Sequence, residues 1–207
     1  MFVFTRRRII KPSQFAQAVD FSIESAAHVS KLIGKNITVS RLTFGQPAGV
    51  VQFTYLFDQM SELDQSQEKI TSDAATAEYG VRAAELFEGA AEDNLGRLVV
   101  STIQEPRPVM NVISAIAVPG RAADVVAFGT EMHQAVSSVT GAPAAFVVSV
   151  SGAFGGTRFA MGADSMAGLQ AANEKLQGDG TVAKLMEKAR DLFVPGSGQS
   201  VILRKIN

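Results

Sequence analysis

The sequence contains no cysteine, and this absence excludes several kinds of chemistry at once. A chain without thiols forms no disulfide, has no thiolate nucleophile and cannot bind a metal ion or cluster through cysteine sulfur. Histidine is scarce as well, with two residues among 207, and neither histidine lies in a cluster of aspartate and glutamate typical of metal ligands. The sequence therefore predicts no metal site and no cofactor.

Long apolar runs and an excess of charge of one sign are missing too. Every hydrophobic stretch is interrupted within about ten residues, whereas a membrane-spanning helix needs about twenty. The basic residues 6–8 are not followed by the apolar region and cleavage site of a secretory peptide. With 19 basic and 20 acidic residues, the net charge of −1 gives no long-range attraction to nucleic acid. We expect a cytoplasmic protein that binds neither membranes nor nucleic acids.

What the sequence does contain is an internal duplication. One block of residues recurs 107 positions later: Pro12, Ala16, Phe21, Glu24, Val29, Ser30 and Gly34 return as Pro119, Ala123, Phe128, Glu131, Val136, Ser137 and Gly141. A second block recurs 106 positions later, and its members include Gly49, Phe53, Asp58, Leu63, Asp73 and Phe87, which return as Gly155, Phe159, Asp164, Leu169, Asp179 and Phe193. The duplication predicts two similar modules, residues 1–104 and 105–207, which meet in the proline-containing segment 104–108.

Each copy reads as strand, helix, strand, strand, helix, strand. The expected strands are residues 2–10, 37–44, 50–57 and 97–103, then 110–118, 144–151, 157–161 and 200–206. Gly34 and Gly141 stand where a helix C-cap needs a left-handed residue. Aspartates are the expected N-caps of a helix in two parts, Asp58 and Asp164 for the first part, Asp73 and Asp179 for the second.

The order βαββαβ is the ferredoxin-like arrangement, an antiparallel sheet with two helices on one face. The strands are apolar on both faces: Phe53 and Tyr55 belong to one set, and Val50 and Leu56 belong to the other. Because the face without helices also needs cover, we expect the second sheet to supply it. The predicted fold class is therefore α+β, with two ferredoxin-like repeats whose antiparallel sheets pack face to face as an intrachain α+β barrel.

In element order, repeat length and capped helices, the sequence resembles the dimeric α+β barrel superfamily, in particular members with both repeats in one chain. The resemblance covers nearly all of residues 2–206. It implies relatives such as cofactor-independent monooxygenases, haem-degrading and haem-peroxidising enzymes, polyketide cyclases and NIPSNAP-type proteins. It also implies a site in the cavity between sheet and helices. The haem ligand of haem-binding members would lie on a later helix, where this chain has no histidine, so haem is disfavoured.

Four side chains are candidates for a site. His28 borders the apolar stripe of its helix and could act as a catalytic general base; the alternative is an ordinary helix histidine without a catalytic partner. Arg158 shares its strand face with small residues and could bind an anionic ligand, with Gln52 and Thr54 as the matching polar positions. An arginine at a sheet edge, or paired with an acid, remains the alternative. We expect Tyr55 to be a core aromatic with its hydroxyl hydrogen-bonded.

Two functions of different classes are compatible with these observations. The first is a small-molecule-binding α+β barrel, including a cofactor-independent enzyme, monooxygenase-like or cyclase-like, that acts on an apolar or aromatic metabolite. The alternative is a non-catalytic interaction or assembly protein with a filled interior. The sequence leaves open whether the chain is an enzyme, and the partners it allows are a small apolar or anionic ligand and further copies of the chain.

Overall fold

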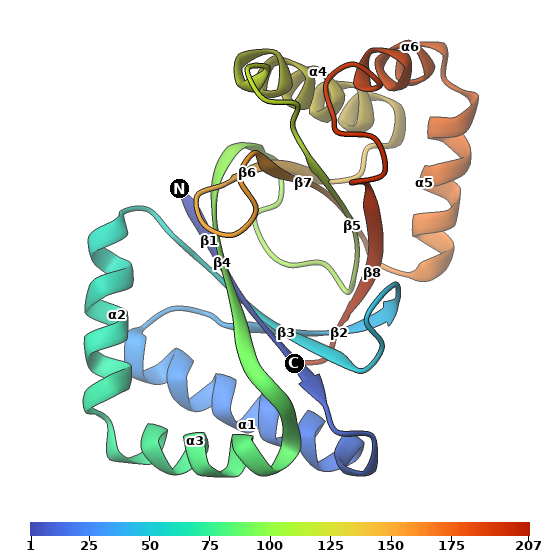
Figure 1. The fold of residues 1–207 in the computed structure, drawn as a ribbon. Helices are drawn as coiled ribbons and strands as arrows, with labels where there is room; N and C mark the ends of the chain where they lie inside the picture. The colour runs from blue at the N-terminus through green and yellow to red at the C-terminus, as the bar shows by residue number, and fades with distance from the viewer. The chain divides into compact units, whose positions relative to one another are not determined.

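The computed structural model describes all of residues 1–207 and contains the helices and strands in the predicted order (Figure 1). The first repeat comprises β1 (Phe2–Ile10), a 3-10 turn (Pro12–Gln14), α1 (Phe15–Ile33), β2 (Thr38–Phe44), β3 (Val50–Phe57), α2 (Met60–Ser72), α3 (Ala74–Leu86) and β4 (Phe87–Ser101). The second comprises β5 (Val109–Ile116), α4 (Ala122–Thr140), β6 (Ala144–Ser149), β7 (Gly156–Ala163), α5 (Met166–Gly178), α6 (Gly180–Ala189) and β8 (Gln199–Lys205). No helix is long and apolar enough to cross a membrane.

The chain forms two compact units. Unit 1 consists of Met1–Leu95 together with Lys205–Asn207, and unit 2 consists of Gly96–Arg204. The division falls inside β4, so this strand begins in one unit and ends in the other. The module boundary at 104/105, which follows the sequence repeat, stays a prediction.

The strands of both units follow the same antiparallel order. In unit 1, β1 pairs with β3 and β3 pairs with β2. In unit 2, β5 pairs with β7 and β8, and β6 pairs with β7 and with the second half of β4. The order β1-β3-β2 in the first repeat therefore matches the order β5-β7-β6 in the second. The predicted α+β class with two βαββαβ repeats is confirmed.

The strand register establishes which residues of the two repeats are equivalent. The relevant partners are Phe4–Tyr55, Arg6–Phe53 and Arg8–Val51 in unit 1, and Asn111–Met161, Ile113–Phe159 and Ala115–Thr157 in unit 2. Since Phe53 and Phe159 are repeat partners, Ile113 and Ala115 occupy in unit 2 the positions that Arg6 and Arg8 occupy in unit 1. Side chains two apart on a strand share a face, so both arginines lie on the face that carries Phe53 and Tyr55.

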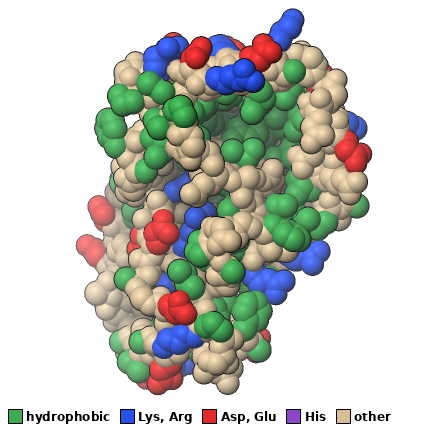
Figure 2. Space-filling model, turned by 45° about the vertical axis from the view of Figure 1, so that its right-hand side comes forward, with side chains coloured by type: hydrophobic (Ala, Val, Ile, Leu, Met, Phe, Trp, Pro, Cys, Tyr) green, Lys and Arg blue, Asp and Glu red, His purple; other side chains and the backbone are tan.

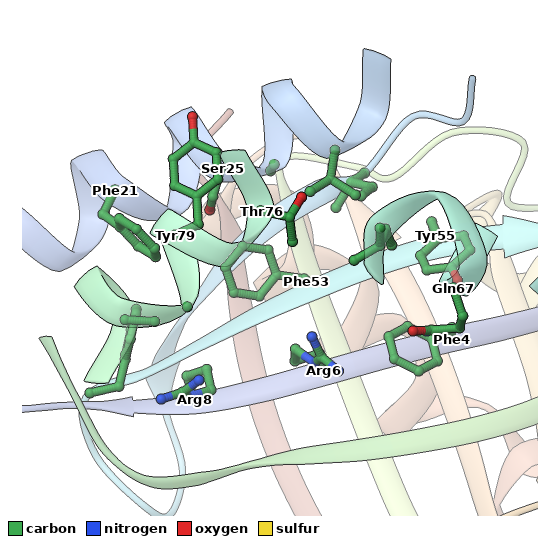
Figure 3. A pocket seen from close by; sticks show the side chains of 17 residues that line it. Phe4, Arg6, Arg8, Phe21, Ser25, Phe53, Tyr55, Gln67, Thr76 and Tyr79 are labelled. Carbon is green, nitrogen blue, oxygen red and sulfur yellow. The ribbon is translucent and has the colours of Figure 1, made fainter. Parts of the chain in front are cut away.

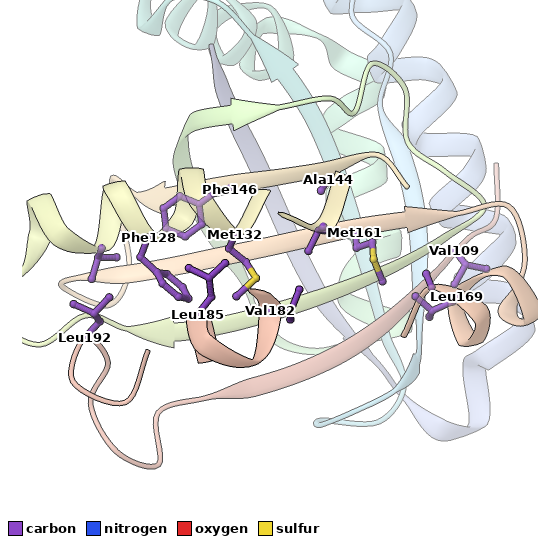
Figure 4. Packing of buried hydrophobic residues seen from close by; sticks show 13 residues of the cluster. Val109, Phe128, Met132, Ala144, Phe146, Met161, Leu169, Val182, Leu185 and Leu192 are labelled. Carbon is purple, nitrogen blue, oxygen red and sulfur yellow. The ribbon is translucent and has the colours of Figure 1, made fainter. Parts of the chain in front are cut away.

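The two units differ in how completely they are packed. Unit 2 has one continuous apolar cluster between its sheet and helices, built around Phe128, Phe146 and Met161 (Figure 4). There the ring of Phe146 lies so close to α4 that a Cβ on Gly129 would come within 2.1 Å of it, so only glycine fits. Unit 1 instead has two smaller clusters. Phe53 is partly buried and packs against both of them.

The helix ends agree with most of the predicted caps. Gly34 and Gly141 both have a φ of 71°, and Asp73 and Asp179 are the N-caps of α3 and α6. The prediction that Asp58 and Asp164 are N-caps is wrong, because each helix begins one residue later.

Different side chains satisfy the free backbone N–H groups at these two helix starts. Ser165 accepts a hydrogen bond from the backbone N–H of Gly168, and the carboxylate of Glu62 accepts bonds from the backbone N–H groups of Asp58 and Gln59. The N-caps are therefore Gln59 and Ser165.

The molecular surface carries charges of both signs. On the face shown in Figure 2, basic and acidic side chains are interspersed rather than gathered by sign. This distribution agrees with the net charge of −1.

Candidate functional site

A pocket of about 210 Å³ lies in unit 1 between the sheet and the helices (Figure 3). Its floor is formed by side chains of β1 and β3, and its other walls by α1, α2 and α3. The floor residues are Phe4, Arg6, Arg8, Phe53 and Tyr55, and the polar residues from the helices are Ser25, Gln67, Thr76 and Tyr79. Figure 3 shows Arg8 near one end of the pocket and Tyr55 near the other, with Arg6 and Phe53 between them.

The pocket lies between the two apolar clusters of unit 1, which are bridged by Phe53. Phe21 and Phe87 belong to one cluster, Ala26 and Tyr55 belong to the other, and all four line the pocket. Protein interiors are normally packed with few voids larger than a water molecule. A pocket of this volume within a packed unit is therefore a feature that needs a reason.

At the equivalent positions of unit 2 the side chains are apolar. The three substitutions in the helices, from unit 1 to unit 2, are Ser25 to Met132, Thr76 to Val182 and Tyr79 to Leu185. All three unit 2 residues are buried in its apolar cluster. On the strand, Ile113 and Ala115 replace the two arginines. The same repeat thus folds with an apolar set at these positions, and the polar set of unit 1 is not required for the fold.

The two arginines of the pocket floor differ in their partners. Arg6 makes a two-pronged ion pair with Asp93 of β4, with both N–O distances 2.7 Å, and this carboxylate raises the pKa of Arg6. Arg8 lies 4.9 Å from the centre of the Phe87 ring and has one long contact, 3.5 Å from Nη2 to the carbonyl oxygen of Gly89. Its Nε is buried and has no hydrogen-bond partner. Burial, and then the charge of Arg6, lower the pKa of Arg8.

Tyr55 is the second polar group of the pocket without a partner. The residue is 5% exposed, and its buried hydroxyl makes no hydrogen bond, so the prediction of a hydrogen-bonded hydroxyl is wrong. Burial raises the pKa of Tyr55 to about 12. The phenol therefore stays protonated at neutral pH and can donate a hydrogen bond into the pocket.

His28 lies beside the pocket but does not line it. Its Nε2 is 2.8 Å from Oδ2 of Asp73, the N-cap of α3, and the same oxygen accepts bonds of 2.8 Å from the backbone N–H and the hydroxyl of Thr76. The hydrogen bond from His28, followed by those from Thr76, lowers the pKa of Asp73. Thr76 lines the pocket, so His28 is connected to the pocket wall through Asp73. Its role as a general base stays a prediction.

The structure brings Gln52 and Thr54 together, on the other face of β3. The Gln52 Nε2 donates to the Thr54 hydroxyl at 3.1 Å, and Arg7 Nε donates to Gln52 Oε1 at 2.8 Å. Since Phe53 and Tyr55 face the helices, Gln52 and Thr54 point away from them and from His28. As a ligand-binding pair they stay a prediction.

Arg158 belongs to unit 2, where it is opposite Ser114 of β5 and Val147 of β6 in the strand register. Its neighbours Phe159 and Met161 pack in the cluster beneath the helices, so alternation places Arg158 on the opposite sheet face. This agrees with the orientation expected from the sequence. Ligand binding by Arg158 stays a prediction.

Solved structures with the same fold are known, although their sequences are very different. No protein-family model matches this sequence, and no curated protein matches it. A proposed monooxygenase from Fusobacterium nucleatum superimposes with a TM-score of 0.73 at 7% identity, over 100% of this chain and 92% of that one. A proposed monooxygenase from Lactobacillus acidophilus gives 0.70 at 11% identity, over 99% and 93% of the two chains. An anthrone oxidase-like protein gives 0.70 at 8%, over 100% and 91%.

These comparisons establish the fold and not the activity. Proteins that share a fold can carry unrelated sites, and identities of 7–11% show the fold alone. The predicted resemblance to dimeric α+β barrel proteins is confirmed at the level of the fold.

Proposed function

We propose that this chain binds a small, flat, largely apolar molecule in the pocket of unit 1. The observation that carries the proposal is the difference between the repeats, because unit 2 has the buried apolar residues Met132, Val182 and Leu185 where unit 1 lines its pocket with polar side chains. An apolar set at these positions is therefore compatible with the fold, and unit 1 keeps polar groups there. Positions where a sequence departs from good packing, although the fold does not require it, are typical of functional sites.

The size and lining of the pocket limit the ligand. An apolar cavity of about 150 Å³ is large enough for benzene, so about 210 Å³ supports a ligand of one or two rings. Phe4 and Phe53 supply aromatic surface on the sheet side, and Tyr79 supplies it on the helix side. Aromatic side chains of this kind favour stacked or edge contacts with a flat ligand.

Chemical conversion of the bound molecule would need a general base close to it. His28 is the candidate from the sequence, and its Nε2 is held by Asp73 outside the pocket lining. The pocket lining itself contains no carboxylate and no histidine. The geometry therefore supports binding most directly, and monooxygenase-like or cyclase-like turnover by His28 is the finer hypothesis.

Transferring the unit 2 side chains into unit 1 tests the proposal. The triple variant Ser25→Met, Thr76→Val, Tyr79→Leu should narrow the pocket at Ser25 and replace the polar side chains of its helix wall with residues that the second repeat already accommodates. We expect small aromatic probes, measured by ligand-observed NMR, to bind the unchanged protein and to bind the variant at least tenfold more weakly.

The control for this test is Val81→Met, which adds a similar side chain at an exposed position of α3. It should leave probe binding unchanged. Equal binding of the probes by the triple variant and by the unchanged protein would refute the proposal.

A further inference from the structure

We propose that the ligand of this pocket is an aromatic carboxylate whose anionic group binds Arg8, beside Phe87. This inference rests on the proposed function, namely that the unit 1 pocket binds a small molecule. It adds the charge of the ligand and the direction in which the ligand lies.

The charges of the pocket are unbalanced in one place. Arg6 is neutralised by the two-pronged contact with Asp93. Arg8 has no carboxylate in contact and keeps a buried Nε–H without an acceptor. No residue that lines the pocket is acidic. The positive charge of Arg8 is therefore the one that an incoming anion would compensate.

The fold does not account for an arginine at this position. Burying a charge or an N–H without a partner destabilises a protein unless another group compensates. The cation–π contact with Phe87 offsets part of this cost but leaves Nε–H unpaired. Unit 2 has Ala115 at the equivalent position and folds in the same way. A planar guanidinium with a free N–H is well suited to bind a carboxylate.

Tyr55 indicates how the rest of the ligand lies. Arg8 is paired with Val51 and Tyr55 is paired with Phe4, so the two groups are four residues apart along the strands, about 13 Å. In Figure 3 they lie at opposite ends of the pocket, with Phe53 between them. The free hydroxyl of Tyr55 can donate to an oxygen at the far end of the ligand. The ligand then has a carboxylate at Arg8, a ring over Phe53 and an acceptor at Tyr55.

A matched pair of probes tests the charge of the ligand. 2-Naphthoate and 2-naphthamide have nearly the same shape and differ in charge, and their Kd values can be measured by calorimetry or NMR. We expect the unchanged protein to bind the acid at least tenfold more tightly than the amide. In Arg8→Met, which keeps an apolar side chain of similar length, affinity for the acid should fall about 10–100-fold, the range of a charge-assisted hydrogen bond. Affinity for the amide should stay within about twofold.

Two further variants complete the design. Arg41→Met is the matched control, because Arg41 is also a strand arginine stacked on a phenylalanine, 5.6 Å from the Phe15 ring, but does not line the pocket. It should leave both affinities unchanged. Arg8→Lys keeps the charge without the planar geometry and should lower affinity for the acid only severalfold, so the inference remains testable if Arg8→Met unfolds.

Different results would overturn the anion inference and the proposed binding function. Equal binding of acid and amide by the unchanged protein, or an unchanged ratio in Arg8→Met, would overturn the anion inference and leave the pocket as a binding site. The proposed function is overturned if neither probe binds the unchanged protein. It is also overturned if both probes bind the triple variant as tightly as they bind the unchanged protein.

Discussion

Tyr55 shows at the scale of one residue what distinguishes the pocket from the core around it. The side chain is almost wholly buried, yet its hydroxyl has no partner. Met161 occupies the equivalent position in unit 2 and packs without a polar atom to satisfy. A buried hydroxyl without a hydrogen bond lowers stability by about 1–3 kcal/mol. At this position unit 1 therefore carries an unpaired hydroxyl at the expense of stability.

Tyr55→Phe should therefore stabilise the free protein. Removing the unpaired hydroxyl while keeping the ring is expected to increase the free energy of unfolding by about 1 kcal/mol. Urea denaturation at pH 7 measures the change. Tyr79→Phe is the control, because the Tyr79 hydroxyl is hydrogen-bonded to Glu24 at 3.2 Å, and its loss should not stabilise the protein. A decrease in stability for Tyr55→Phe would contradict the structure at this position.

The same residue predicts a change in the alkaline range. The pKa of Tyr55 in the folded protein is raised to about 12, above the usual value near 10. The folded protein therefore favours the neutral phenol. The stability that depends on this neutral form is fully present below pH 10 and is lost as the pH rises from about 10 through 12. The stability of the unchanged protein should fall more steeply across this range than that of Tyr55→Phe. Parallel pH profiles for the two proteins would contradict the assignment.

At the scale of elements, matching aspartates begin α3 and α6, but only one has a histidine partner. Asp179 caps α6 by accepting from the backbone N–H groups of Thr181 and Val182. Asp73 caps α3 and also binds His28 on α1, so it joins two helices that form walls of the pocket. The contact fastens α3 to α1 next to Thr76.

Asp73→Asn and Asp179→Asn separate capping from this contact. Asparagine is as good an N-cap as aspartate, so Asp179→Asn should leave Tm nearly unchanged, while Asp73→Asn should lower Tm by weakening the bond to His28. Because the pKa of Asp73 is lowered in the folded protein, the stabilisation is present at neutral pH and is lost as the pH falls below about 4. The difference between Asp73→Asn and the unchanged protein should disappear there. Equal Tm values for the two variants at pH 7 would show that the His28 contact contributes nothing.

Several elements could be predicted from the sequence because local chemistry determines them. Gly34 and Gly141 end their helices because the C-cap takes a left-handed backbone conformation that glycine adopts readily. The predicted fourth strand began at residue 97, whereas β4 begins at Phe87. Its first half contains the acidic residues Glu88, Glu92 and Asp93, and a polar segment of this kind shows no strand pattern. Only its place in the sheet makes this segment a strand.

The site was harder to predict than the fold for a similar reason. The sequence places Arg6 and Arg8 on the same strand face, but it does not show that Asp93 neutralises one of them and leaves the other without a carboxylate. That distinction depends on a contact 87 positions away along the chain. The sequence signal that could have found the pocket was the comparison of Ser25, Thr76 and Tyr79 with their apolar partners in the second repeat.

At the scale of the whole molecule, the two copies of one repeat have the same architecture and different interiors. Unit 2 has a continuous apolar core beneath its helices, and unit 1 has a pocket with two unpaired donor groups. A duplicated fold allows one copy to be packed for stability while the other carries a site. We therefore expect ligand binding in unit 1 alone.

Methyl NMR during a titration with 2-naphthoate tests this claim most directly. Shifts are expected only for methyl groups that line the pocket, namely those of Ala26, Val29, Ile37, Ile70 and Ala83. The methyl signals of Met132, Val182 and Leu185, which are buried at the equivalent positions of unit 2, should not shift. Shifts of equal size in both sets, or in the unit 2 set alone, would contradict the claim that the open repeat is the binding repeat.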